Sequence, residues 1–115
     1  MKDPCVYILA SGVNGTLYVG VTRDVWNRME EHTKELISGF TKTYGIKDLV
    51  YYEFHPSMTG AIKREHQLKR WRRLWKIRLI EEMNPDWANL YDPTTRSIAF
   101  GSGDIEAKDE VDDIE

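Results

Sequence analysis

The sequence predicts one small α/β (α+β) domain, in which a three-stranded, mostly antiparallel sheet is flanked by helices in the order β-β-α-β-α. Short runs of β-branched and aromatic residues alternate with longer segments of helical periodicity, which indicates a mixed fold. The length of 115 residues is enough for one domain, and 41% hydrophobic residues can supply its core.

A β-hairpin is predicted near the start of the chain. Residues 5–10 and 17–21 are rich in β-branched and aromatic side chains. The segment between them contains Asn14 and Gly15, a pair common in tight turns.

A helix is predicted over residues 25–38. Side chains able to cap it precede it at residues 22–24, and Gly39 follows as a natural stop. Residues recur along it at helical spacing, namely Val25, Met29, His32 and Leu36.

A third strand is predicted over residues 49–54, followed by one long helix from Met58 or Thr59 to about Met83. The stripe of this helix expected to face the core recurs at three- and four-residue steps and comprises Ala61, Leu68, Trp71, Trp75 and Leu79.

The second helix is predicted to end at Asn84, because Pro85 disfavours helix in the residue before it. The short segment after it is expected to pack Trp87 and Leu90 back onto the body of the domain.

Charge is distributed unevenly over the chain. The net charge is −3, but residues 101–115 alone carry seven acids and one lysine, which leaves +3 on residues 1–100. We therefore divide the chain into a folded domain over residues 1–95 and an acidic tail over residues 96–115. The tail has too little apolar surface to fold alone and is expected to be disordered. Alternatively, it mimics nucleic acid and competes for the basic domain.

The positive charge is concentrated at residues 63–78, where eight Lys or Arg residues accompany one acid. Such a segment attracts polyphosphate, and it predicts a nucleic-acid partner, DNA in preference to RNA. The side chains expected to contact phosphates are Lys69, Arg70, Arg72, Arg73 and Lys76.

Several classes of protein are excluded. No apolar run approaches the roughly 20 residues of a membrane span, and no signal-peptide pattern is present. The lone Cys5 can form neither an internal disulfide nor a multi-cysteine zinc site. We expect a cytoplasmic protein without zinc or membrane partners, and no pattern indicates its oligomeric state.

Five side chains have the spacing of a catalytic constellation. Two tyrosines, Tyr7 and Tyr18, can lie side by side on one face of the hairpin. Arg28 and His32 are four residues apart and share one face of the first helix. Glu65 lies at the core-facing edge of a strongly basic helix, where a carboxylate must find a cation or a metal.

Together, the hairpin spacing, the helix arginine and the later glutamate resemble the GIY-YIG nuclease family, and most closely its small stand-alone bacterial members. The resemblance covers roughly residues 4–92. It implies a GIY-YIG fold and hydrolysis of phosphodiester bonds in nucleic acid. It also implies that Arg23 replaces a lysine of some repair members, because Val21 follows the second glycine here. Thr41 stands where homing members have a further histidine.

The resemblance also implies a role for each residue. Glu65 would hold Mg²⁺ (or Mn²⁺), Arg28 would bind phosphate oxygens, and Tyr18 would bind phosphate or the attacking water. Tyr7 or His32 would be the general base. For this role, neighbouring positive charge would have to lower the pKa of Tyr7 or allow its transient deprotonation, and activity should then rise between about pH 7 and 9.

Each residue also has an ordinary structural interpretation. Tyr7 and Tyr18 could form a cross-strand aromatic pair, Arg28 an ion pair with Asp24 or Glu31, and Glu65 an ion pair with Lys69. A late asparagine of the family pattern could be Asn84, which a helix C-cap explains equally well.

The sequence therefore predicts a metal-dependent DNA endonuclease of low sequence specificity, selective for DNA structure and acting in DNA repair or processing. The alternative is a non-catalytic nucleic-acid-binding module on the same fold. A third interpretation is a protein-interaction domain whose basic helix docks an acidic partner.

Overall fold

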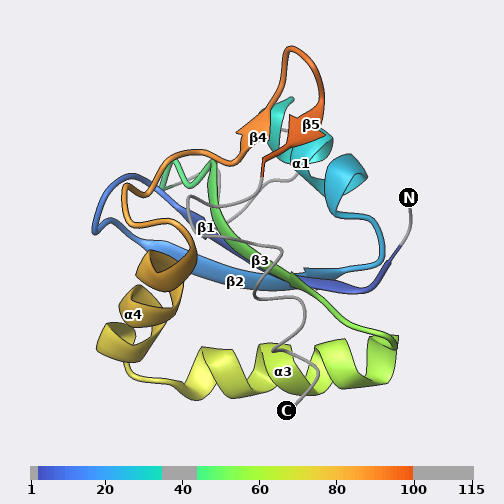
Figure 1. Cartoon of the computed structure of the whole chain (residues 1–115), viewed down its shortest axis with the longest axis vertical. Helices are drawn as coiled ribbons and strands as arrows, with labels where there is room; N and C mark the ends of the chain where they lie inside the picture. Colours follow the sequence, from blue (N-terminus) through green and yellow to red (C-terminus); the bar gives the residue numbers. More distant parts are fainter. Residues whose placement is uncertain (1–2, 35–43, 100–115) are drawn as a thin grey trace.

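The computed structural model describes residues 3–34 and 44–99. Within these ranges the elements are β1 (Cys5–Ala10), β2 (Leu17–Thr22), α1 (Val25–Thr33), β3 (Asp48–Phe54), α3 (Met58–Arg70), α4 (Arg73–Met83), β4 (Tyr91–Asp92) and β5 (Ser97–Ile98). Figure 1 shows these elements around a central sheet. The predicted mixed α/β class and its antiparallel sheet are confirmed.

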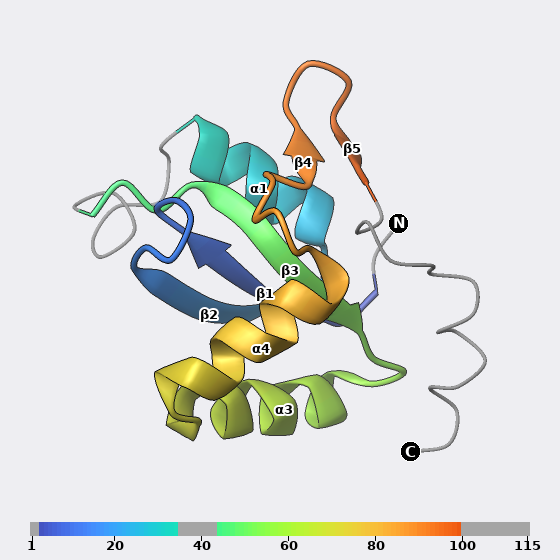
Figure 2. The same ribbon diagram turned by 60° about the vertical axis from the view of Figure 1, so that its left-hand side comes forward.

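The strand order of the main sheet is β2-β1-β3, with both pairings antiparallel. All six residues of the central strand β1 are completely buried. Figure 2 shows the reason, since α1 covers one face of the sheet while α3 and α4 cover the other. The uninterrupted apolar run of β1 is thus explained by burial on both of its faces.

Two cores lie on the two faces of the sheet. On one face, Tyr7 and Leu9 pack with Val25 and Met29 of α1. The opposite face carries the second core, which includes Val6, Ile8, Val50, Ala61, Leu68, Ile80 and Trp87. The predicted packing of Trp87 and Leu90 against the body is confirmed, because both are buried.

Helix α1 begins as predicted. The Asp24 carboxylate caps it by accepting a hydrogen bond from the backbone N–H of Asn27 at 3.1 Å. Val25, Met29 and His32 form its buried face. The predicted continuation to residue 38 falls mostly on residues 35–43, which lie outside the described residues.

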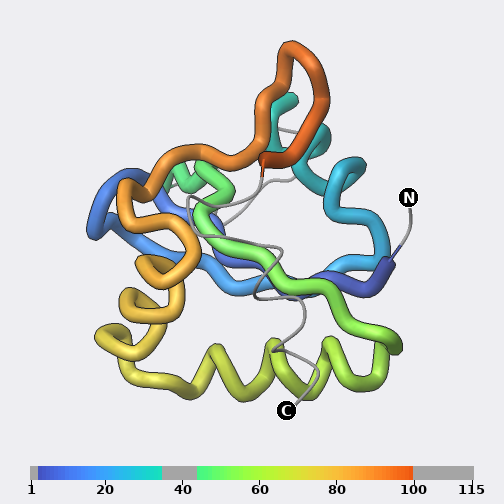
Figure 3. Tube along the Cα trace, in the orientation of Figure 1, coloured from blue at the N-terminus to red at the C-terminus, as the bar shows by residue number. Residues whose placement is uncertain are grey.

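The single long helix predicted from Met58 to Met83 is wrong. The chain leaves the helical conformation at Trp71 and Arg72, whose φ and ψ angles are extended, and it turns into α4 (Figure 3). If the helix continued through this segment, cations three and four residues apart, such as Lys69 and Arg73, would repel one another. The turn also lets Ile80 of α4 join the same core as Leu68 of α3.

The predicted apolar stripe is partly wrong for the same reason. Ala61 and Leu68 are buried, and Trp71 and Leu79 are partly buried, but Trp75 is 50% exposed. The change of direction after α3 turns Trp75 out of the face that would have continued the stripe.

After α4, the chain returns to the sheet and adds the two-stranded β4–β5 ribbon, which the sequence did not predict. The backbone N–H of Ala99 donates to the Leu90 carbonyl at 2.8 Å. Pairing with the body therefore continues to Ala99, whereas residues 100–115 of the predicted tail lie outside the described residues. None of the described helices has the length and apolar character needed to cross a membrane.

Candidate active site

Tyr7 and Tyr18 lie on the same face of the hairpin, as predicted. Tyr7 pairs with Gly20 and Tyr18 pairs with Leu9, so the tyrosines occupy diagonal positions of the β1–β2 ladder. Their ring centroids are 6.4 Å apart, with the ring planes tilted by 43°.

The ring of Tyr7 lies directly over Gly20. A Cβ atom at position 20 would lie 2.5 Å from both Cζ and the hydroxyl oxygen of Tyr7. Since real Cβ contacts are longer, only glycine leaves room for the buried Tyr7 ring at this point of β2. The glycine of the Tyr18-Val19-Gly20 triplet therefore sets the position of the Tyr7 hydroxyl.

Arg28 of α1 reaches this hydroxyl. Its Nη1 donates a hydrogen bond to the Tyr7 oxygen at 3.1 Å, and its Nε lies 3.4 Å from a Glu31 carboxylate oxygen. The ion pair with Glu31 matches the ordinary interpretation of Arg28, while the bond to Tyr7 joins it to the tyrosine pair. One guanidinium thus connects α1 to the centre of the sheet.

The acidity of Tyr7 bears on whether it can be the general base. Burial raises the pKa of the Tyr7 phenol to about 12, although the positive charge and hydrogen bond of Arg28 act in the opposite direction. Tyr7 therefore lacks the lowered pKa that favours a general-base role, because the cost of ionising a buried phenol outweighs one guanidinium. Tyr7 is consequently a neutral phenol at physiological pH.

His32 lies one turn beyond Arg28 on α1 and is 6% exposed. Its ring meets that of Tyr7 edge to face, with the centroids 6.4 Å apart. Its Nε2 is buried and has no hydrogen-bond partner among the described residues. Burial, and then the charge of Arg28, lower its pKa, so the imidazole is neutral at physiological pH. A buried polar atom without a partner marks a place where a ligand or water belongs.

Glu65 is a buried carboxylate on α3, with 6% of its surface exposed. Its Oε2 lies 2.6 Å from Lys69 Nζ, and its Oε1 lies 3.5 Å from His66 Nε2. The pair with Lys69 matches the ordinary interpretation. Helix α3 packs against both β2, the strand that carries Tyr18, and β1. The structure thus joins four of the predicted catalytic residues through contacts with Tyr7, whereas Glu65 lies on α3, the helix that covers the opposite face of the sheet.

The surroundings of Glu65 are compatible with a divalent cation. A carboxylate is a hard oxygen ligand, and one of its oxygens already has a cationic partner in the Lys69 ammonium. Lys69 is 52% exposed and can rotate into water to make room. The described residues contain no group of three or more His, Cys, Asp or Glu side chains that could hold a metal. Glu65 would therefore share the ion with water or substrate.

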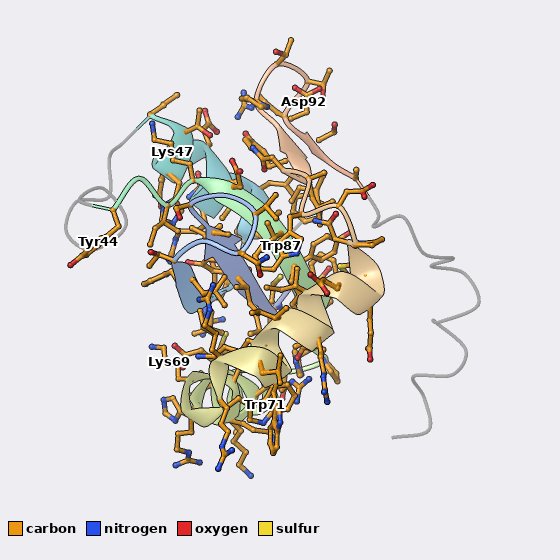
Figure 4. The ribbon with its side chains drawn as sticks, turned by 90° about the vertical axis from the view of Figure 1, so that its left-hand side faces the viewer. Tyr44, Lys47, Lys69, Trp71, Trp87 and Asp92 are labelled. Carbon is orange, nitrogen blue, oxygen red and sulfur yellow. The ribbon has the colours of Figure 1, made fainter. Side chains whose placement is uncertain are left out.

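The predicted phosphate-binding residues divide into two groups. Arg23, Lys69, Arg70 and Arg72 are exposed, and Figure 4 shows Lys69 close to the place where α3 meets α4. Arg73 uses one nitrogen within the protein instead, because its Nη2 donates to the carbonyls of Asn14 and Gly15, each at 2.7 Å. It thereby ties α4 to the β1–β2 loop.

The last of the set, Lys76, is half buried. Burial and the neighbouring Arg73 lower the pKa of its ammonium. It is a weaker candidate for phosphate contact than the exposed cations. Thr41, the site of the departure from the homing pattern, lies outside the described residues.

A network on the α3 side of the sheet was missed. The Glu53 carboxylate accepts hydrogen bonds from Tyr51 at 2.6 Å and from Arg64 Nε at 2.9 Å, and it lies 2.6 Å from His55 Nε2. His55 is therefore held in a hydrogen-bonded network around Glu53. The alternation Tyr51, Glu53, His55 puts all three on one face of a strand, and this signal could have revealed them.

Asn84 has a structural role. Its Nδ2 donates to the carbonyls of Val50 and Ala88, at 3.2 and 2.8 Å, and its Oδ1 accepts from the Ala88 N–H at 3.1 Å. It caps α4 and ties the following segment to β3. The C-cap interpretation accounts for this buried asparagine.

Comparison with known proteins identifies the class to which this fold and this site belong. The model of the GIY-YIG catalytic domain matches residues 3–78, and the chain belongs to this family. Membership places it among the nucleases, a generally metal-dependent class whose substrates are nucleic acids.

Particular relatives are small proteins. UPF0213 proteins of Staphylococcus aureus strains Mu3 and Mu50 are each 38% identical to the chain over 82 residues, which covers 71% of this chain and 99% of theirs. The solution NMR structure of the UPF0213 protein BH0048 from Bacillus halodurans is 30% identical. It aligns with 70% of this chain and 84% of that one, with a TM-score of 0.45.

Proposed function

We propose that this protein is a Mg²⁺- or Mn²⁺-dependent endonuclease that hydrolyses phosphodiester bonds in DNA. It has low sequence specificity, selects DNA by structure, and acts in DNA repair or processing. The observation that carries the proposal is the hydrogen bond from Arg28 to Tyr7, beside Tyr18 and the unpartnered His32 nitrogen.

Arg28 is the phosphate-binding group of the proposed site. One of its nitrogens fixes the Tyr7 hydroxyl, and the guanidinium has further N–H groups that can face a phosphate oxygen. Such donors stabilise the negative charge that grows on the oxygens as the phosphorane forms. Arg28 is partly exposed, which lets a substrate reach it.

Tyr7 acts as a neutral hydrogen-bonding group in this scheme. Its oxygen accepts from Arg28, so the buried phenol holds the partly exposed guanidinium in place for phosphate. His32 is the proton acceptor, because it is neutral and its Nε2 has no partner within the described part of the chain. Water attacks phosphorus and gives one proton to His32. The bond between phosphorus and the leaving oxygen breaks with its electron pair on that oxygen, which takes up a proton from solvent water.

Glu65 is the proposed metal ligand. A divalent cation bound there would neutralise charge on the phosphate and on the leaving oxygen. Release of Lys69 from Glu65 frees a carboxylate oxygen for the ion and leaves an ammonium close to the incoming DNA backbone. The Lys69 side chain thus serves either as the ion-pair partner of Glu65 or as a phosphate contact.

Exposed cations before α1 and at the junction of α3 and α4 supply the affinity. Contacts from Arg23, Arg70 and Arg72 to phosphates would position DNA without reading its bases. The expected binding is therefore strongly salt-dependent and weakly dependent on sequence.

The alternative is a non-catalytic nucleic-acid-binding module. It is supported by the short Glu65–Lys69 ion pair, in which the carboxylate already has a partner. Both functions predict DNA binding, so only cleavage can distinguish them.

The test is cleavage of labelled duplex, single-stranded, flap, nicked and four-way-junction DNA with Mg²⁺ or Mn²⁺. Wild type is compared with Glu65→Gln and with Glu82→Gln, which removes an exposed acid of α4. Cutting that is lost with Glu65→Gln and kept with Glu82→Gln supports the nuclease. Tight binding without cutting by any variant supports the binding module.

A further inference from the structure

The corner between α3 and α4 exposes large apolar side chains. Leu74 and Trp75, in the first turn of α4, are 55% and 50% exposed. Adjacent apolar side chains that remain in water commonly mark a surface that binds a partner. We call these two residues the corner platform.

Aromatic contacts hold the platform in place without covering it. The rings of Trp71 and Trp75 meet edge to face, with centroids 5.7 Å apart and an angle of 82°. The Arg64 guanidinium lies 5.2 Å from the Trp71 ring centre and braces it from α3. An edge-to-face pair covers at most one face of either ring, so Trp75 is both fixed and accessible.

Charge identifies the kind of partner. The platform lies within residues 63–78, which carry a net +7, and the neighbouring Arg70 and Arg72 are exposed. Figure 4 shows Trp71 at this corner with Lys69 nearby. A second copy of the chain would bring like charges together on this surface, whereas a polyphosphate is complementary to it.

The combination of an accessible indole and surrounding cations is suited to unpaired nucleotides. Bases in a duplex are stacked on one another, but an unpaired base has a free face that can stack on an aromatic ring while cations hold its phosphates. The Arg73 hydrogen bonds to Asn14 and Gly15 fix the corner against the loop that leads into β2, the strand of Tyr18.

We propose that Trp75 and Leu74 form a stacking site for an unpaired base, flanked by the phosphate contacts of Arg70 and Arg72. This inference rests on the proposed function and deepens it, because it specifies substrates with single-stranded segments. Flaps, splayed arms and frayed junctions contain such segments, and intact duplex does not.

The test measures binding of the full chain to a fluorescein-labelled 12-nucleotide single strand and to a matched blunt duplex, in EDTA. Trp75→Ala should weaken single-strand binding about tenfold and duplex binding at most about twofold. Trp75→Phe should retain most of the affinity, since it keeps a stacking ring. Ile62→Ala, which trims another exposed apolar residue, should bind like wild type.

Equal losses for both DNAs, or no loss, would overturn the inference. Self-association that Trp75→Ala abolishes, without a change in DNA binding, would overturn it in favour of a contact between copies. Leu74→Ala provides a second variant should Trp75→Ala fold poorly, and thermal unfolding checks each. The binding test is carried out in EDTA, so its result does not depend on cleavage. If single-strand binding depends on Trp75 but the protein never cuts DNA in the cleavage test, the nuclease proposal is refuted and the stacking site stands. If the protein cuts DNA but its single-strand binding does not depend on Trp75, the stacking site is refuted and the nuclease proposal stands.

Discussion

Arg28 Nη1 donates a hydrogen bond to the Tyr7 hydroxyl oxygen over 3.1 Å, linking the first helix to the central strand of the sheet. The bond holds the partly exposed guanidinium in place, while its other N–H groups can meet a phosphate. This relationship makes the two residues one functional unit, and three of the following predictions concern it or the groups around it.

Replacing Arg28 tests the phosphate-binding role. We expect Arg28→Lys to lower kcat for cleavage by about 100-fold, because a lysine lacks the planar fork that can serve Tyr7 and phosphate together. DNA affinity in EDTA should change by less than about threefold, since one cation is kept. A variant that cuts at the wild-type rate would contradict the assignment.

Gly20 and Gly12 form a matched pair of glycines. A Cβ at Gly20 would collide with the Tyr7 ring, whereas one at Gly12 meets no atom within 4 Å. Gly20→Ala should cost about 1–3 kcal/mol of unfolding free energy and abolish most cleavage by displacing the hydroxyl. Gly12→Ala should leave both the free energy of unfolding and the cleavage rate nearly unchanged. Urea unfolding and cleavage rates check this, and equal behaviour of the two variants would exclude the steric explanation.

The pH dependence of cleavage distinguishes His32 from Tyr7 as the proton acceptor. Burial lowers the pKa of His32 below its ordinary 6.5, so activity should rise as pH increases through that lower value and then stay flat from about pH 7 to 9. Ionisation of Tyr7, whose pKa is raised to about 12, would instead give a rise of about tenfold per pH unit over that range. Such a rise in wild type, lost in Tyr7→Phe, would reassign the role to Tyr7.

The Glu53 network should contribute to stability. Burial tends to raise the pKa of Glu53, but hydrogen bonds from Tyr51, His55 and Arg64 outweigh it and leave the pKa lowered. Its contribution is therefore present above the ordinary value of 4.5 and is lost as pH falls through the lower folded value.

Glu53→Ala tests this network directly. It should reduce the free energy of unfolding by about 2–3 kcal/mol at pH 7, because it leaves a half-buried Arg64 without its partner. The reduction should be smaller near pH 3, where less of the contribution of Glu53 remains. Chemical unfolding at the two pH values is the measurement, with Glu82→Gln as the control. A loss that is the same at both pH values would show that the charge of Glu53 is not its source.

The acidic segment after Phe100 should weaken DNA binding. A chain that ends at Phe100 loses seven acids and one lysine and changes from −3 to +3. It should bind DNA at least about tenfold more tightly at 50 mM salt, with a smaller difference at 300 mM. Fluorescence anisotropy at both salt concentrations measures this. Unchanged affinity at low salt would show that the segment does not compete with DNA.

The sequence by itself determined the elements whose signals are local. Two runs of β-branched and aromatic residues and a turn pair specify the β1–β2 hairpin, and period-two geometry brings Tyr7 and Tyr18 to one face. Helix geometry likewise places Arg28 and His32, which are four residues apart, on one face of α1. These relationships depend on residues close in the chain or joined by a short turn, so pattern alone is sufficient.

Only the tertiary structure decided the rest. Helical periodicity continues through Trp71, but packing of Ile80 and Trp87 on the sheet bends the chain there and leaves Trp75 in water. The raised pKa of Tyr7 also depends on burial by distant segments, and this burial outweighs the neighbouring Arg28. Exposure, acidity and long-range hydrogen bonds are properties of the packed molecule, because they depend on which remote residues exclude water from a side chain.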